Sequence, residues 1–258
     1  MSAIEIVRLM NEEEAAVQRA LKSAEAGLAT AAEYAAEAFQ RGGRVIYVGA
    51  GTSGRIATTD AAEMPPTFGI EPDRFIALVA GGSLANERAV EDAEDDIHAS
   101  ITALNTMGVG KKDIVIGLAA SGSTPFVVSA VHHAQQKGIW TCGIANNRGA
   151  ALLEVADLGI LLDTGPEILT GSTRLKAGTA QKLALNRIST IAMVLSGKVI
   201  ENLMVDVKAK NQKLKERCAR IVCELTPATK DEAFEMLESR NWNIRAVIDA
   251  FPDLAKVS

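Results

Sequence analysis

Positive charge and aromatic side chains are both scarce in this sequence. The 27 Lys and Arg residues are outnumbered by 32 Asp and Glu residues, which gives a net charge of -5. The chain therefore has no basic field to attract nucleic-acid phosphates, and we expect no nucleic-acid partner. Aromatic residues make up only 4% of a chain that is 48% hydrophobic. This balance favours helices packed closely on a parallel sheet over an aromatic-filled β-barrel, so the composition predicts an α/β protein.

Residues that bind metals are also few. The sequence has three cysteines and three histidines, and Cys142, Cys218 and Cys223 form no C-x-x-C motif. Because no group of these residues has the spacing of metal ligands, we predict no metal site and no other cofactor. Thiols without a disulfide pattern suit a reducing compartment.

Long apolar segments are absent as well. No uninterrupted apolar stretch approaches the roughly 20 residues of a membrane-spanning helix. The first residues, MSAIE, lack the basic segment and apolar core that mark a signal peptide. We therefore expect a cytoplasmic protein with no membrane partner.

Five apolar runs alternate with segments that have helical spacing. The runs cover residues 44–49, 75–79, 113–118, 140–144 and 158–162. We predict helices at residues 85–105 and 125–137 between them, and two helices within residues 4–40 ahead of the first run. Alternating strands and helices need crossover connections, which produce a doubly wound parallel sheet with helices on both faces. Ligands of such sheets bind at the carboxyl ends of the strands.

The last part of the chain has a different character. A long helix is predicted at residues 175–195, and short amphipathic helices at 230–238 and 244–251 follow Thr226 and Pro227. Trp242 is expected to anchor a small core there. We therefore expect a sheet domain at residues 1–222, with its N-terminal and long C-terminal helices, and a small helical appendage at residues 223–258.

Two loops rich in hydroxyl groups follow the first and third apolar runs. Residues 49–54 read GAGTSG, and residues 119–125 read AASGSTP. The glycines of the first loop would also suit a dinucleotide, but the second run ends in VAGG, without the acidic residue that binds the ribose. Hydroxyl and N–H groups at helix starts suit a phosphomonoester instead. Ordinary N-caps are the alternative for either loop. The candidate phosphate ligands are Gly51, Thr52, Ser53, Ser121, Ser123 and Thr124.

Five longer motifs carry a family resemblance. Residues 49–69 read GAGTSGRIATTDAAEMPPTFG, residues 89–96 AVEDAEDD, residues 119–125 AASGSTP, residues 170–186 TGSTRLKAGTAQKLALN and residues 197–209 GKVIENLMVDVKA. They are similar to the motifs of the N-acetylmuramic acid 6-phosphate etherases, which belong to the sugar isomerase (SIS) domain proteins. The resemblance implies a SIS-type fold, with an appendage that looks like a truncated UBA domain.

The resemblance also implies a reaction and the residues that perform it. It implies a lyase that releases lactate from N-acetylmuramic acid 6-phosphate by removal of the C2 proton, elimination and addition of water. The family's catalytic glutamates match Glu63 and Glu94. From residue type and spacing alone, Pro65 and Pro66 should end the helix just after Glu63, which places Glu63 close to the ligand loops, with an ordinary surface residue near a helix end as the alternative. Glu94 stands in an acidic cluster of the kind that more often marks a solvated helix face.

Further expectations concern anion binding and assembly. Arg174 and Lys176 are candidates to hold the phosphate or the lactyl carboxylate, with surface pairing as the alternative. The family resemblance implies a homodimer. The chain departs from the family's usual pattern at Ser83, where a Glu is usual, and at Ser123, where an Arg is usual. We therefore expect the polar lining near the ligand to differ.

Two other functions fit the same loops. A non-catalytic sugar-phosphate regulator, such as the related glucokinase regulatory protein, needs the phosphate loops but not the carboxylate pair. A sugar-phosphate isomerase also removes a C2 proton but expels no leaving group. Retention of Glu63 and Glu94 argues for an enzyme, and the etherase-like motifs DAAEMPP and RLKAGTAQ argue against an isomerase.

Overall fold

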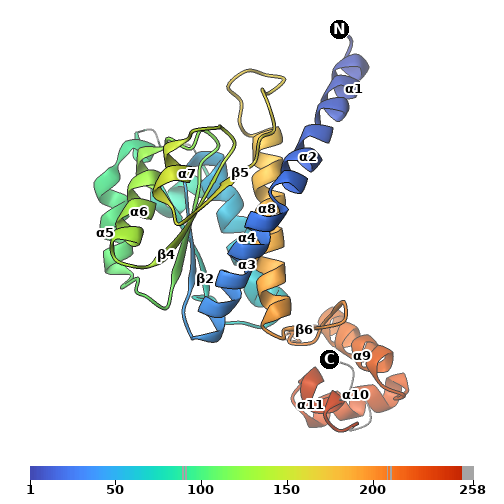
Figure 1. The fold of residues 1–258 in the computed structure, drawn as a ribbon. Coiled ribbons are helices and arrows are strands. Elements are labelled where there is room, and N and C mark those ends of the chain that lie inside the picture. Colours follow the sequence, from blue (N-terminus) through green and yellow to red (C-terminus); the bar gives the residue numbers. More distant parts are fainter. Residues whose placement is uncertain (89, 91, 208, 210, 252–258) are drawn as a thin grey trace. The chain divides into compact units, whose positions relative to one another are not determined.

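The chain forms two compact units, which are drawn in Figure 1. The computed structural model describes residues 1–88, 90, 92–207, 209 and 211–251. The first unit contains Met1–Ala62 and Pro72–Ala192, and the second contains Glu63–Glu71 and the chain from Met193 onward. The expected boundary between residues 222 and 223 falls inside helix α9 (Gln212–Leu225) instead. This helix lies in the second unit because its apolar face forms part of that unit's own core.

A sheet of five parallel strands forms the centre of the first unit. Its order is β2 (Phe75–Val79), β1 (Val45–Gly49), β3 (Ile114–Leu118), β4 (Trp140–Ala145) and β5 (Leu158–Leu161). All residues of β1 and β3 are buried, as expected for central strands covered on both faces. The parallel sheet predicted from the sequence is thus confirmed. The strand order reverses between β1 and β3, and the hydroxyl-rich loops follow these two strands.

Helices cover both faces of this sheet (Figure 1). α5 (Ile97–Thr106) and α6 (Pro125–Gln136) lie on one side, and α3 (Glu25–Gln40) and α8 (Lys176–Leu195) lie on the other. On the first side, Ile46 and Val48 of β1 share a buried cluster with Val127 and Val131 of α6. The short helix α7 (Ala151–Val155) connects β4 to β5. The buried side of α3 is almost entirely alanine, which allows this helix to approach the sheet closely.

Three helices, rather than the expected two, precede β1. They are α1 (Ala3–Glu13), α2 (Ala15–Ser23) and α3. The breaks fall at Glu14 and Ala24, where the sequence has no glycine or proline to indicate them. No residue of α1 is buried, and Ile4 and Val7 are 56% and 50% exposed.

The single helix expected at residues 85–105 is wrong. The chain instead forms the 3-10 turns η1 (Gly82–Asn86) and η2 (Ala93–Asp95), and α5 begins only at Ile97. Gly81 and Asp92 have φ of 83° and 61°, and such left-handed residues do not fit inside a helix. Ala89 and Glu91, two members of the AVEDAEDD motif, lie outside the described residues.

Helix α4 (Gly51–Phe68) continues through Pro65 and Pro66, which were expected to end it. Proline fits the helical φ, so the helix can pass through both residues, although each lacks the N–H for one helical hydrogen bond and its ring crowds the carbonyl four residues earlier. The helix ends at Gly69, which has a φ of 66° and donates its N–H to the Pro65 carbonyl at 3.0 Å. Gly69 therefore acts as the terminating residue that the prolines were expected to be.

The second unit has its own apolar core. Beyond Glu63–Glu71 and a short hairpin of β6 (Val199–Ile200) and β7 (Leu203–Met204), it contains α9, α10 (Lys230–Ser239) and α11 (Ile244–Ile248). The expected anchor Trp242 packs edge-on against Phe234 at the border of this core, with 5.5 Å between ring centroids. No helix among the described residues is both long and apolar enough to cross a membrane.

Candidate functional site

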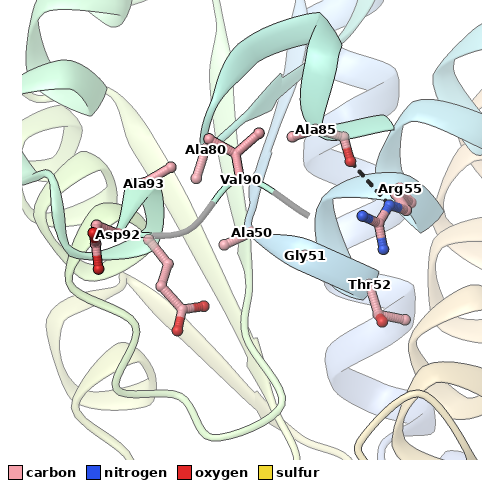
Figure 2. A pocket seen from close by; sticks show the side chains of 10 residues that line it. Ala50, Gly51, Thr52, Arg55, Ala80, Ala85, Val90, Asp92 and Ala93 are labelled. Atoms are coloured by element: carbon pink, nitrogen blue, oxygen red, sulfur yellow. Dashed lines mark hydrogen bonds between the residues drawn. The ribbon is translucent and has the colours of Figure 1, made fainter. Parts of the chain in front are cut away.

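A pocket of about 300 Å³ opens at the carboxyl ends of β1 and β2 (Figure 2). Its lining comes from the start of α4, from the residues that follow both strands, and from η2: Ala50, Gly51, Thr52, Arg55, Ala80, Ala85, Val90, Asp92, Ala93 and Glu94. β1 and β2 end in register at Gly49 and Val79, so the loops that follow them emerge at the same edge. This is the edge at which parallel sheets bind ligands.

Glycines bring the start of α4 very close to β1. A Cβ atom on Gly49 would lie 2.7 Å from the Gly54 nitrogen, and a Cβ atom on Gly54 would lie 3.1 Å from the Gly49 oxygen. Between them, Gly51 has a φ of 52°, which other residues rarely adopt. The glycine pattern therefore serves close strand–helix packing, and it places the first N–H groups of α4 at the pocket.

The two hydroxyl groups of the first loop have different surroundings. Thr52 lines the pocket and has no side-chain hydrogen bond among the described residues. Ser53 is buried and donates its hydroxyl to Gln181 Oε1 of α8 at 2.8 Å. Gln181 Nε2 donates in turn to Asn146 Oδ1 at 3.2 Å, and Asn146 Nδ2 donates to the Leu162 carbonyl at 2.8 Å. Ser53 thus ties α4 to α8 and to the loop after β4.

The second loop is more open to solvent. Ser121 and Ser123 are exposed, and the Ser123 hydroxyl and N–H both lie within hydrogen-bond distance of Ser121 Oγ, at 3.2 and 3.3 Å. Thr124 precedes α6 but makes no side-chain capping bond. The ordinary N-cap interpretation therefore does not describe this threonine.

Glu94 lies in η2 and lines the pocket. Asp92, in the left-handed conformation, turns the chain into η2 and also lines the pocket. Figure 2 places Asp92 and Ala93 on one side and Thr52 and Arg55 of α4 on the other. The structure thus brings Glu94 together with Gly51 and Thr52 in one pocket.

Glu63 belongs to the second unit and lies on the last part of α4, where its side chain is exposed. No described residue forms a hydrogen bond or an ion pair with its carboxylate. The role that the family resemblance implies for Glu63 stays a prediction.

A buried carboxylate anchors α4 in the first unit. Asp60 is 6% exposed and accepts hydrogen bonds from Tyr47 Oη at 2.9 Å, Asn186 Nδ2 at 2.7 Å and Ser189 Oγ at 3.1 Å. Burial raises the pKa of the Asp60 carboxyl, although the three hydrogen bonds and the Lys182 ammonium oppose that rise. Asp60 thus fixes α4 against β1 and α8, a role that residue type and spacing do not indicate.

The two cations expected to hold anions do not line the pocket. Lys176 is buried at the start of α8, and its ammonium group is paired with Glu13. The Glu167 carboxylate accepts the Lys176 and Ala177 N–H groups at 3.1 and 2.9 Å, so it already occupies this helix start. Arg174 is exposed in the turn before α8. Anion binding by Arg174 and Lys176 therefore stays a prediction, and at Lys176 it has to compete with Glu13.

Arg55 and Asp92 are charged pocket residues that were not predicted from the sequence, and Arg55 is the cation of the two. It follows Gly51 by four residues, so both lie on one face of α4. The Arg55 side chain is half-buried, and its Nε donates to the Ala85 carbonyl of η1 at 2.9 Å. The available signal was the last letter of GTSGR, one helical turn after the glycine that opens α4.

No group of three His, Cys, Asp or Glu side chains in the described part of the chain is arranged to hold a metal ion.

The sheet order and the paired loops define a SIS domain, the fold of sugar-phosphate isomerases and their relatives. The SIS domain family matches residues 89–189, and the N-terminal SIS domain of glucokinase regulatory protein matches residues 27–135. A phosphoheptose isomerase from Francisella tularensis has the same fold, with a TM-score of 0.58 at 19% identity over 77% of this chain and 100% of its own.

Curated relatives identify the particular family. The N-acetylmuramic acid 6-phosphate etherase of Geobacillus thermodenitrificans is 50% identical over 96% of this chain and 84% of its own length. The etherase of Halalkalibacterium halodurans is 51% identical over 96% of this chain and 83% of its own. The chain belongs to the N-acetylmuramic acid 6-phosphate etherase family, which confirms the resemblance seen in its motifs.

Proposed function

We propose that this chain cleaves the lactyl ether of N-acetylmuramic acid 6-phosphate and yields N-acetylglucosamine 6-phosphate and D-lactate. The observation that carries the proposal is that Glu94 lines the same pocket as Gly51 and Thr52 at the start of α4, in a chain that belongs to the etherase family. The pocket thus combines a carboxylate with N–H and hydroxyl groups suited to a phosphate.

The proposed reaction has three steps. In the open-chain sugar, the C1 aldehyde acidifies the C2 proton, and Glu94 removes it. The C3–O bond then breaks, a C2–C3 double bond forms, and Glu63 protonates the departing lactate oxygen. Glu63 next takes a proton from water, which adds at C3, while Glu94 returns the proton to C2. Each carboxylate is expected to contribute roughly a hundred- to ten-thousandfold to the rate.

The ionised and protonated forms of the two glutamates alternate in this scheme. Glu94 begins as a carboxylate and ends as one, and Glu63 begins protonated and is restored by the attacking water. The aldehyde accepts the electron pair, so the scheme requires neither a metal nor an organic cofactor. We therefore expect lactate release to survive dialysis against a chelator, and a requirement for an added divalent ion would contradict the scheme.

The decisive test is D-lactate release from N-acetylmuramic acid 6-phosphate, combined with exchange of the C2 proton in deuterated water. Glu94→Gln keeps the shape of the side chain but not its basicity, so both signals should collapse. Glu63→Gln should suppress lactate release yet retain some exchange, because Glu94 still takes and returns the proton. Comparable lactate release by the wild type and both variants would refute the assignment. Exchange lost only in Glu63→Gln would reverse the two roles.

A non-catalytic regulator is the second candidate, because the N-terminal SIS domain of glucokinase regulatory protein matches residues 27–135. Such a protein would bind a sugar phosphate and release no lactate. The turnover assay therefore separates the two candidates directly.

We also propose that the chain acts in the cytoplasm as a homodimer. All three cysteines are free, which suits a reducing compartment. The exposed apolar side chains of α1, including Ile4 and Val7, support self-association. Sedimentation at several protein concentrations would test the dimer, and a single species of monomer mass would contradict it.

A further inference from the structure

We infer that Arg55 recognises the lactyl carboxylate and so distinguishes the ether substrate from the sugar phosphate that remains after cleavage. The inference rests on the proposed function, because it assigns one part of that substrate to one residue of the pocket. The proton transfers assigned to Glu63 and Glu94 stay with those residues, and the role inferred for Arg55 is substrate selection.

The first argument is the placement of Arg55. The residue lines the pocket together with Thr52 (Figure 2), and Glu94 belongs to the same lining. Its Nε is committed to the Ala85 carbonyl at 2.9 Å, which fixes the guanidinium group at the pocket wall. Among the residues that the structure describes, no acid forms an ion pair with Arg55, and its two terminal amino groups have no acceptor. A guanidinium held in this way presents two parallel N–H donors, the arrangement that matches both oxygens of a carboxylate.

The second argument is the charge of the pocket. Arg55 is the only cation among its described lining residues, whereas Asp92 and Glu94 bring two carboxyl groups. A substrate with its own carboxylate would meet repulsion from these groups unless a cation held it. The other proposed cations are placed elsewhere: Lys176 is paired with Glu13, and Arg174 is exposed before α8.

The third argument is the chemistry of the sugar. The base must reach C2, and the lactyl ether is attached to the adjacent carbon, C3. The lactyl carboxylate lies only a few bonds beyond the ether oxygen, so it must bind close to the base. The C6 phosphate is attached at the other end of the carbon chain. A cation in the pocket of Glu94 therefore suits the C3 substituent. The phosphate is assigned to the N–H and hydroxyl groups of the two loops, of which Gly51 and Thr52 line the same pocket, so the comparison of two ligands has to separate these roles.

Binding to two ligands tests this inference. Glu94→Gln serves as a host that stops turnover, and calorimetry measures its affinity for N-acetylmuramic acid 6-phosphate and for N-acetylglucosamine 6-phosphate, which lacks the carboxylate. Adding Arg55→Gln should weaken the ether ligand about ten- to a hundredfold, the loss expected for a charge-assisted pair. The affinity for the product should change less than about threefold. Arg55→Lys should recover only part of the loss, because it restores charge without the planar fork.

The controls separate recognition from structure. Arg41→Gln removes an exposed arginine that pairs with Glu37 on α3, and it should leave both affinities unchanged. Equal losses for the two ligands in Arg55→Gln would overturn the inference and assign Arg55 to the phosphate or to the shape of the pocket. Unchanged affinities would also overturn the inference and would leave Arg55 with a structural role only, the hydrogen bond to the Ala85 carbonyl. If the wild type releases no lactate and the Glu94→Gln host binds neither ligand, the proposed function itself has failed.

Discussion

The loops after β1 and β3 have similar sequences, yet the structure uses them differently. In the first loop, Ser53 is buried and bonded to Gln181, and of the two hydroxyl residues Thr52 is the one that lines the pocket. In the second loop, Ser121 and Ser123 are exposed and contact each other. A hydroxyl after a parallel strand can thus secure the scaffold or remain available for a ligand, and the sequence pattern alone does not say which.

The helices that follow the loops extend this contrast. α4 is held by a polar network, in which Asp60 accepts hydrogen bonds from β1 and α8. α6 is held mainly by apolar contacts, since its buried residues are Phe126, Val127, Ala130, Val131 and Ala134. Its polar contacts with α5 are few, and in one of them the Ser129 hydroxyl lies 2.9 Å from the Ser100 hydroxyl. Polar networks fix one geometry because each unmade bond is costly in a buried place. We infer that α4 supplies the more rigid side of the site.

The largest effect is expected from Gly49→Ala in the first loop. The added Cβ would lie within 2.9 Å of three backbone atoms of Ser53 and Gly54, none of which can move without shifting α4. Overpacking of this kind should lower the free energy of unfolding by about 3 kcal/mol or more. Denaturant unfolding measures the loss. Gly110→Ala is the matched control, because its added Cβ would meet nothing within 4 Å. Equal stability of the two variants would contradict the close packing of β1 and α4.

A substitution in the second loop should change ligand affinity rather than stability. Ser121→Ala removes an exposed hydroxyl, so stability should change little, by less than about 0.5 kcal/mol. If the hydroxyl binds the phosphate, the affinity for N-acetylglucosamine 6-phosphate should fall about ten- to a hundredfold in calorimetry. Unchanged affinity would remove Ser121 from the candidate phosphate ligands. The unphosphorylated sugar should bind poorly to the wild type and the variant alike.

Ser53→Ala should lower stability more than ligand affinity, the reverse of what is expected for Ser121→Ala. It leaves the buried Gln181 amide without the donor at 2.8 Å, and an unsatisfied buried group of this kind costs about 1–2 kcal/mol. The melting temperature should therefore fall, and the affinity for the sugar phosphate should fall less than in Ser121→Ala. A variant of normal stability that binds the phosphate poorly would return Ser53 to the role predicted from the sequence.

Much of the fold was predictable because its strands are uninterrupted apolar runs that end in small residues. Residues 75–79 were placed as observed, and each of the other four strands of the parallel sheet differs by one residue at one end. The errors occurred where local signals compete. Pro65 and Pro66 indicated a helix end, but they lie within the last turns of α4, and Gly69 ends it. The helix expected at residues 85–105 failed at Asp92, an acid in a left-handed conformation that residue type alone does not indicate.

The site was only partly predictable, because spacing does not report which way a side chain faces. Gly51, Thr52 and Glu94 come together in one pocket, whereas Lys176 belongs to an ion pair with Glu13, a residue far away in sequence. Arg55 and Asp60 lie within residues 49–69, where the predicted roles fell on glycines, hydroxyl residues and Glu63. Their partners, Ala85 and Asn186, are brought close only by the packing of the chain.

The smallest effect is expected from the pH dependence of the Asp60 network, which distinguishes α4 from α6. Burial raises the folded-state pKa of Asp60 above the value of about 3.9 for an unfolded chain. The folded protein therefore binds the Asp60 proton more tightly than the unfolded chain does. This difference in proton binding adds to the free energy of unfolding. The added stability is fully present below the unfolded pKa and is lost as the pH rises through the folded pKa. Asp60→Asn carries no such proton. The melting temperature of the wild type minus that of Asp60→Asn should therefore decrease as the pH is raised upward from about 4. Asp73→Asn, which alters an exposed acid, is the control and should show no comparable trend. A difference that grows with pH would mean that the hydrogen bonds from Tyr47, Asn186 and Ser189 outweigh burial, and that Asp60 is held as an anion at the centre of the network.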